Sequence, residues 1–134
     1  MNKTYRVITD QFVTTEEVVI ALRSKQYKQG KQDLYDPTNN CYCVMGVIAK
    51  LVGFNEADIK TRCYLSGLFE SFVEGYYAYA DENLRCITSF EGVLIRYNDN
   101  DNLSFNQIAD KLENKDDPIK DLTIKIPKVE LINV

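Results

Sequence analysis

Residues 41–52 constrain the fold most strongly, because this stretch is apolar nearly all the way round a helix. Asn40 precedes it as a helix cap, and Gly53 follows it as a stop. A helix without a polar face has to be buried on every side, so the other elements must pack around it. Gly46 in its interior costs about 1 kcal/mol relative to Ala, which predicts close packing of another element against that position.

Two further helices are predicted before and after this segment. The first begins after Thr14, which forms a capping box with Glu17, and Gly30 ends its apolar pattern. The other begins at Asn55 and runs to near Val73.

A polar Asn/Asp loop runs directly into the start of the fourth predicted helix. Ser104 and Gln107 form its capping box, and the helix fades near Asn114. The loop Asn98–Asn102 before it therefore has a fixed exit. Its side chains, with the unpaired N–H groups of the first helical turn, are placed to contact a ligand.

The segments predicted as strands are shorter than the predicted helices. Residues 85–90 and 93–97 are predicted as two strands joined by a tight hairpin turn at residues 91–92. Alternating apolar residues over 122–131 predict a final strand or hairpin, in which Pro127 must lie at an edge, a bulge or a turn.

The length and the element pattern predict one domain spanning residues 1–134. Its expected class is α+β, with about four helices packed on a small, mostly antiparallel sheet. No stretch has the roughly 18 apolar residues of a membrane span. The N-terminus also lacks the apolar region of a secretory signal. We therefore expect a cytoplasmic protein.

The residue types exclude several kinds of chemistry. The chain has no histidine, which excludes Ser-His-Asp and Cys-His catalysis and most catalytic zinc sites. Its four cysteines (Cys41, Cys43, Cys63 and Cys86) form no CxxC pair, so free buried thiols are favoured over a zinc site. No phosphate-binding loop or dinucleotide fingerprint is present. We expect no metal and no cofactor.

The charge is uneven along the chain. The formal net charge is −4, and residues 98–121 alone carry seven acids against three lysines. This balance disfavours binding to duplex nucleic acid. A basic stretch at residues 23–31 leaves room for a local pocket that binds a small anion.

Phe90 and the Asn98–Asn102 loop are the first candidate site. If the predicted hairpin folds back, Phe90 supplies a ring for stacking, and Asn98 or Asn100 supplies an amide that reads a base edge. Arg85 and Arg96 flank the hairpin and could bind phosphates. The alternatives are that Phe90 belongs to the core, that the loop is a plain turn with Asx hydrogen bonds, and that the arginines are solvated. A calcium loop fails in detail, because the glycine and the final glutamate are missing.

Arg23 and Tyr27 are the second candidate site. With Lys28 and Gln29 they follow the first predicted helix and could close on an anion. A solvated basic face is the alternative, since the C-terminal end of a helix repels anions. No carboxylate is placed in a recognisable acid/base pair, so we expect a protein that is not an enzyme.

Three stretches together resemble a group of small proteins encoded by phages and prophages. They are Ala21–Gln29, Cys41–Val47 with its YCCLGV-like core, and Asn98–Asp99 followed by Ser104–Asp110. Within that group the chain resembles the Thoeris anti-defence signal-sequestering proteins, which use a Phe and an Asn spaced like Phe90 and Asn100. The resemblance implies a homo-oligomer, dimeric or larger, that binds a cyclic ADP-ribose isomer or a cyclic oligonucleotide without hydrolysing it.

The sequence thus leads to one functional hypothesis and two alternatives. The hypothesis is a cytoplasmic counter-defence protein of an infected or lysogenic bacterium that sequesters an adenine-containing cyclic nucleotide signal. Phe90 would stack on adenine, Asn98 or Asn100 would read its edge, and Arg85, Arg96 and Arg23 would bind the phosphates. One alternative is a protein inhibitor whose acidic 98–121 surface occupies the basic groove of a defence nuclease. The other is an enzyme with Cys41 or Cys63 as nucleophile.

Overall fold

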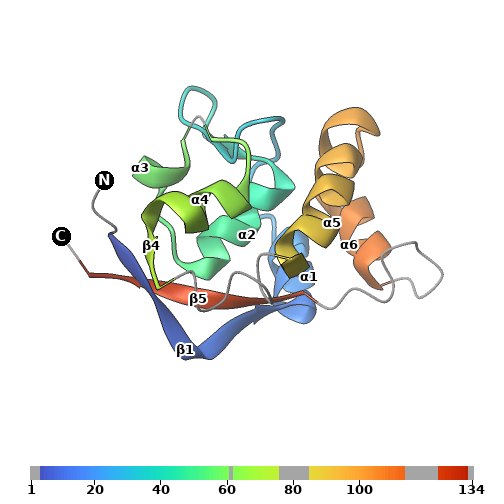
Figure 1. Cartoon of the computed structure of the whole chain (residues 1–134). Coiled ribbons are helices and arrows are strands. Elements are labelled where there is room, and N and C mark those ends of the chain that lie inside the picture. The colour runs from blue at the N-terminus through green and yellow to red at the C-terminus, as the bar shows by residue number, and fades with distance from the viewer. Residues whose placement is uncertain (1–3, 61, 76–84, 114–123, 133–134) are drawn as a thin grey trace.

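The computed structural model describes residues 4–60, 62–75, 85–113 and 124–132, and Figure 1 shows their arrangement. The elements in chain order are β1 (Tyr5–Thr14), α1 (Thr15–Arg23), β2 (Tyr35–Asp36), β3 (Cys41–Tyr42), α2 (Val44–Val52), α3 (Glu56–Ile59), α4 (Leu65–Phe72), β4 (Val73–Glu74), α5 (Arg85–Ile95), the π-helical turn η3 (Arg96–Asn100), α6 (Phe105–Glu113) and β5 (Lys125–Leu131).

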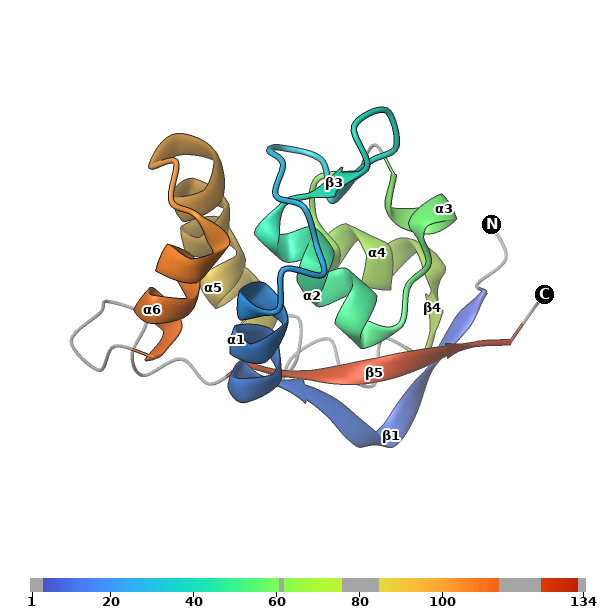
Figure 2. The ribbon, with the colours of Figure 1, turned by 180° about the vertical axis from the view of Figure 1, so that it is seen from behind.

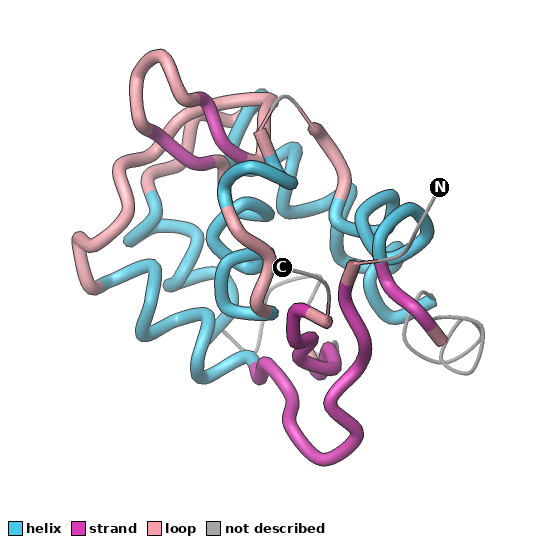
Figure 3. The backbone as a smooth tube through the Cα atoms, turned by 90° about the vertical axis from the view of Figure 1, so that its left-hand side faces the viewer, coloured by secondary structure: helices cyan, strands magenta, loops and turns pink. Residues whose placement is uncertain are grey.

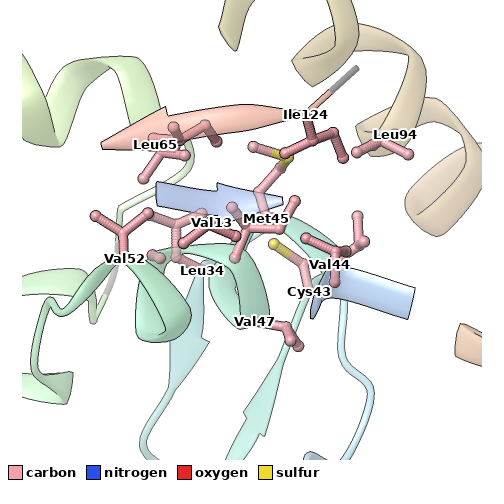
Figure 4. Close-up of a cluster of buried hydrophobic side chains, with 14 of the residues drawn as sticks. Val13, Leu34, Cys43, Val44, Met45, Val47, Val52, Leu65, Leu94 and Ile124 are labelled. Carbon is pink, nitrogen blue, oxygen red and sulfur yellow. The ribbon is translucent and has the colours of Figure 1, made fainter. Parts of the chain in front are cut away.

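The apolar segment around Gly46 forms the centre of the core, as its composition predicts. Every residue of α2 from Val44 to Ala49 is buried. Figure 4 shows side chains of α2, Met45 among them, lying with Val13 of β1 and Leu94 of α5. The predicted start was wrong, because residues 41–42 form the strand β3 and the helix begins only at Val44. The predicted stop at Gly53 is confirmed, since its φ of 125° suits glycine.

Gly46 has the close neighbour that its position in a helix predicted. A Cβ atom built on Gly46 would lie 1.7 Å from the carbonyl oxygen of Leu34. The segment that carries Leu34 therefore rests directly on the backbone of α2. Leu34 itself is fully buried, so this approach closes one side of the core.

The sheet has three strands in the order β4-β1-β5, and β2 and β3 form a separate two-stranded ribbon. β1 pairs with β5 antiparallel and with β4 parallel, and its register shifts between Val7 and Phe12. Figures 1 and 2 show the helices gathered on one side of β1 and β5. Pro127 lies on β5, an edge strand, where its missing N–H removes no bond of a central strand. The strand β1 was not predicted.

The predicted hairpin at residues 85–97 was wrong, because this segment is the helix α5 continued by η3. Ile87, Phe90, Leu94 and Tyr97 are all buried. Their spacing of three or four residues is that of one helix face. The β-branched residues and the Glu-Gly pair favoured a hairpin locally, but the burial of one helical stripe decides the structure.

Two of the predicted helix starts are confirmed by their caps. The Thr14 side chain accepts a hydrogen bond from the Glu17 N–H. Ser104 and Gln107 form a complete capping box, in which each side chain accepts from the backbone N–H of the other at 3.1 and 2.9 Å. The long helix predicted from Asn55 to Val73 was wrong, since α3 ends at Ile59 and α4 begins separately. Six α-helices lie within the described residues, against the four expected, and the mixed α and β composition of one compact domain is confirmed in its coarse form.

Glu91 caps α4 from a distance. Its carboxylate accepts hydrogen bonds from the Leu65 N–H at 2.6 Å and from the Ser66 hydroxyl at 3.0 Å. Only 4% of Glu91 is exposed, and this burial raises the pKa of its carboxyl group above the ordinary value. A buried acid from α5 thus satisfies the first N–H group of α4.

Gly46→Ala should destabilise the chain by about 2–3 kcal/mol, because the added methyl group has to displace the Leu34 backbone. Gly92→Ala is the matched control, since Gly92 lies in α5 and a Cβ atom there meets nothing within 4 Å. It should stabilise the chain by about 0.5–1 kcal/mol. Urea denaturation of the variants measures both effects. A destabilising Gly92→Ala would contradict the helical assignment of this segment.

Glu91→Gln should flatten the dependence of stability on pH. The folded chain holds the Glu91 proton more tightly than the unfolded chain does. The free energy of unfolding therefore falls as pH rises from the ordinary glutamate pKa of about 4.3 through the raised folded value. The difference between wild type and Glu91→Gln, measured by urea unfolding from about pH 4 to 7.5, isolates this contribution from other carboxylates. Parallel pH profiles would show that Glu91 titrates normally.

Candidate functional site

The segment between α1 and α2 builds the candidate site. Figure 2 shows this segment passing in front of α2, and Figure 3 shows its two short strands apart from the main sheet. Backbone hydrogen bonds hold it on β3, because the Tyr42 N–H donates to Lys28 and the Gly30 N–H donates to Tyr42. Residues 25–28 and 39–42 are thereby brought to one place.

Asn98 fastens this segment to the rest of the chain. Its Oδ1 accepts from Gln29 Nε2 at 3.0 Å and from the Val44 N–H at 3.2 Å, while its Nδ2 donates to the Gly30 carbonyl at 2.7 Å. Nδ2 also donates to Asp99 at 2.8 Å. Asn98 is 1% exposed, so its amide group forms hydrogen bonds within the chain and is not available to a ligand. It caps α2, whose own N-cap Cys43 makes no side-chain cap bond.

Gln29 also holds the segment between α1 and α2 against the start of α6. Its Nε2 also donates to the Leu103 carbonyl, and its Oε1 accepts from the Phe105 N–H at 3.0 Å, where α6 begins. Asp99 accepts from the Gln32 N–H, and Lys31 donates to Asn102. The Asn98–Asn102 loop therefore binds residues 29–32 of the same chain.

A pocket of about 500 Å³ adjoins this segment at residues 25–28 and 39–40. That volume is within the range of small-molecule sites. Its walls come from the segment after α1, the turn before β3, β3 itself, α2 and α3. It is lined by Lys25, Gln26, Tyr27, Lys28, Asn39, Asn40, Tyr42, Lys50 and Glu56. Three lysines against one glutamate make it locally cationic on a chain of net charge −4.

Aromatic rings form part of the pocket wall. The Tyr27 and Tyr42 rings meet edge to face, with centroids 5.2 Å apart at 85°. Tyr35 lies against Tyr42 with centroids 4.8 Å apart. Burial raises the pKa of both Tyr27 and Tyr42, and Glu56 adds to the effect. Both phenols therefore stay protonated at neutral pH.

Glu56 is held by two of its neighbours in the pocket. Oε1 accepts from the Tyr42 hydroxyl at 3.0 Å, and Oε2 lies 3.1 Å from Lys50 Nζ. A hydrogen bond from its own backbone N–H, followed by the contacts with Lys50 and Tyr42, holds the pKa of Glu56 below its usual value. The carboxylate is ionised at neutral pH.

The pocket also contains unusual backbone. Lys25 and Asn40, with φ of 63° and 52°, lie in the left-handed region. Asn tolerates that region, but it costs a lysine about 1–2 kcal/mol. Lys25 takes the place after α1 where glycine is commonest, so one of the residues that line the pocket has a strained backbone.

The structure separates the predicted site residues. Phe90 is 1% exposed in the core, so the core alternative holds and its ring offers no free face for stacking. Asn98 is likewise buried, whereas Asn100 is exposed. Their predicted approach depended on the hairpin, which does not form.

The predicted phosphate-binding arginines are also dispersed. Arg23 binds Asp110 and Glu113 of α6, and these contacts raise the pKa of its guanidinium. Arg96 is exposed with Asp101 at 3.8 Å. Arg85 begins α5, and its side chain lies outside the described residues. Tyr27 is the predicted site residue that lines the pocket.

Sequence reasoning missed Lys25, Lys50, Tyr42 and Glu56 as a group. The basic stretch and the suggestion of an anion near Tyr27 and Lys28 were the available signals. The opposite wall includes Asn39 and Asn40, which belong to a polar stretch with the turn signals Asp36-Pro37 and Asn39-Asn40. No local pattern relates either segment to Lys50 or Glu56.

The cysteines of the described residues differ in their exposure. Cys41 and Cys43 are buried free thiols, as expected, whereas Cys63 is exposed. Burial raises the pKa of Cys43 to about 12, so its thiol is inert. No group of three or more potential metal ligands occurs among the described residues.

Comparison with known proteins identified no relative of this chain. No family model, curated protein or solved structure matches the chain. Every helix within residues 4–60, 62–75, 85–113 and 124–132 is too short or too polar to cross a membrane.

Asn98→Ala should destabilise the fold by about 2 kcal/mol or more, since it leaves the Gly30 carbonyl and the Val44 N–H without their partner in the interior. Asn100→Ala is the control on the same turn. It should change the free energy of unfolding by less than about 0.5 kcal/mol, because the side chain is exposed. Thermal and urea unfolding measure both. Equal effects would contradict the structural role assigned to Asn98.

Proposed function

We propose that this chain binds and sequesters a small anionic signal of the cyclic nucleotide class in the pocket around Tyr27. The single observation that carries the proposal is a cationic, tyrosine-walled pocket on an acidic chain. Lys25 and Lys28 would hold phosphate, and Tyr27 would contact the base. Amide side chains of Gln26 and Asn39 would orient the ligand.

The charges support an anion rather than a neutral ligand. Lys50 is paired with Glu56, which leaves the ammonium groups of Lys25 and Lys28 without an ion pair among the described residues. Two such groups at one mouth attract a phosphate, and the pocket walls reduce screening by solvent. The resident carboxylate is already balanced by Lys50.

The titratable groups of the pocket support binding without chemistry. The Tyr27 and Tyr42 phenols have raised pKa values and are poor nucleophiles at neutral pH. Glu56 has a lowered pKa and two partners, which makes it a weak general base. Affinity would come from a preformed pocket that the Asn98 and Gln29 contacts hold in shape.

The biological setting rests on the resemblance to phage proteins. We propose a counter-defence role in an infected or lysogenic bacterium, with the chain acting in the cytoplasm as a homo-oligomer. The residues that line the pocket described all come from one chain. The proposed binding site is therefore the pocket around Tyr27 and not the surroundings of Phe90. The proposed function is still the sequestering of a signal molecule.

The protein-inhibitor alternative draws less support. Asp110 and Glu113 bind Arg23, and Asp99 binds the Gln32 N–H. These acids of the 98–121 surface are therefore engaged within the chain. The rest of that surface, from residue 114, lies outside the described residues.

Lys25→Gly should weaken ligand binding by about 10- to 100-fold, the value of one charge-assisted hydrogen bond. The same change relieves a left-handed lysine, so the free energy of unfolding should stay constant or rise by up to about 1 kcal/mol. Native mass spectrometry would first identify binders in a panel of cyclic nucleotides and cyclic ADP-ribose isomers. Isothermal titration would then measure their affinities.

Gln32→Gly is the matched control for this test. Gln32 has a φ of 68°, is exposed, and does not line the pocket. It should gain the same conformational relief and keep full affinity. A protein that ignores the whole panel would contradict the proposed function and favour a protein partner instead.

A further inference from the structure

A groove of about 640 Å³ lies between α1 and α6, and it shares no lining residue with the cationic pocket. Figure 2 shows the two helices packed side by side. The groove is lined mainly by Glu16, Val19, Ile20 and Arg23 of α1 with Leu112 and Glu113 of α6. The ligand binding proposed above uses none of these residues, so the groove is available for a separate task.

The apolar part of the groove is formed by Val19, Ile20 and Leu112. Val19 is buried and Leu112 is partly buried against the core, whereas 63% of Ile20 is exposed. Among the described residues Ile20 is the most exposed of the large apolar side chains. A β-branched residue at an exposed helical position stabilises the helix less than glutamine or lysine would. Contact with a partner would account for an isoleucine at this position.

The rim of the groove is acidic. Glu16 is exposed on α1, and Asp110 and Glu113 lie on α6. Arg23 is the one cation that lines the groove within the described part of the chain, and it binds both Asp110 and Glu113. One guanidinium cannot neutralise two carboxylates, whose side chains remain 69% and 56% exposed. With Glu16, the rim therefore keeps an excess of negative charge.

This charge decides between the possible occupants of the groove. A second copy of the chain, docked through the same face, would bring an equally acidic rim against this one. Like charges that face each other across an interface are costly. An occupant with basic side chains around an apolar centre would instead match both the rim and the apolar part of the groove.

The helices that form the groove indicate the shape of this occupant. Helices α1 and α6 present no unpaired strand edge, so a partner has to be held by its side chains. The groove residues from Glu16 to Arg23 follow α1 for about two turns, or roughly 10 Å. Apolar residues spaced over two turns of a partner helix cover the same length.

We propose that the groove between α1 and α6 docks a basic amphipathic helix of a partner protein. Its apolar face would pack on Val19, Ile20 and Leu112, and its lysine or arginine residues would lie near the acidic rim. This protein-binding surface is additional to the ligand pocket, and neither proposal depends on the other.

The test uses a fluorescein-labelled helical peptide of about 14 residues as the probe, with leucines spaced for one helix face and lysines beside them. A control peptide has the same composition, but its leucines are spread around the helix. Fluorescence anisotropy with the full chain measures both affinities. The wild type should bind the amphipathic peptide at least about tenfold more tightly, because only this peptide presents its leucines together.

Ile20→Gln should weaken binding of the amphipathic peptide by about tenfold, because it removes apolar contact area from the groove. Glutamine is a good helix former, so the fold should be kept. Leu131→Gln is the matched control, since it replaces an exposed apolar residue of β5 outside the groove. This variant should bind the peptide as the wild type does.

Glu16→Gln should weaken the same binding by about two- to fivefold and make it less sensitive to salt, because one carboxylate of the rim is lost. Glu74→Gln on β4 changes the net charge equally outside the groove, so its effect should be smaller. Equal effects of the two variants would show a nonspecific attraction to an acidic chain and overturn the proposal.

The remaining outcomes also decide the question. No binding of the amphipathic peptide to the wild type, equal binding of the two peptides, or an unchanged affinity in Ile20→Gln would each overturn the proposal. Sedimentation velocity of the chain alone tests the second copy as the occupant. We expect the wild type and Ile20→Gln to sediment alike. A dimer that Ile20→Gln converts to a monomer would assign the groove to a second copy instead.

Discussion

The structure depends on helix N-termini that are capped by side chains from distant parts of the chain. Asn98 accepts from the first N–H of α2, Gln29 from that of α6 and Glu91 from that of α4. An uncapped N-terminus leaves N–H groups unsatisfied in the interior. Each cap therefore stabilises a helix and also fixes where a second segment lies against it.

This arrangement explains which parts of the fold could be predicted. The caps at Thr14 and Ser104 are local in sequence, and the helices that follow them begin where expected. Helix α2 was placed one turn early because its cap comes from Asn98, far along the chain. Residues 85–97 were mistaken for a hairpin because local β propensity was weighed above the helical spacing of the apolar residues. Propensity is the weaker of these two signals.

The candidate site was less accessible to sequence reasoning for a related reason. Tyr27 and the basic stretch pointed to an anion, but the pocket also needs Lys50 and Glu56, which tertiary packing brings to it. The polar Asn98–Asn102 loop was predicted to contact a ligand because of its composition. Its amides and acids instead hold the pocket segment in place. Composition can identify side chains able to make directed hydrogen bonds, but it cannot tell whether their partner is internal.

The pairing of β1 with β5 has a consequence for how the chain reaches this structure. Tyr5 lies opposite Leu131, and Thr14 lies opposite Lys125, so the main ladder joins segments separated by most of the chain. Closing so long a loop is entropically costly, and non-local pairing slows folding. During synthesis β1 leaves the ribosome well before β5 does, so the two strands cannot pair until β5 has also emerged. Until β5 emerges, β1 has an unpaired edge that is open to other chains.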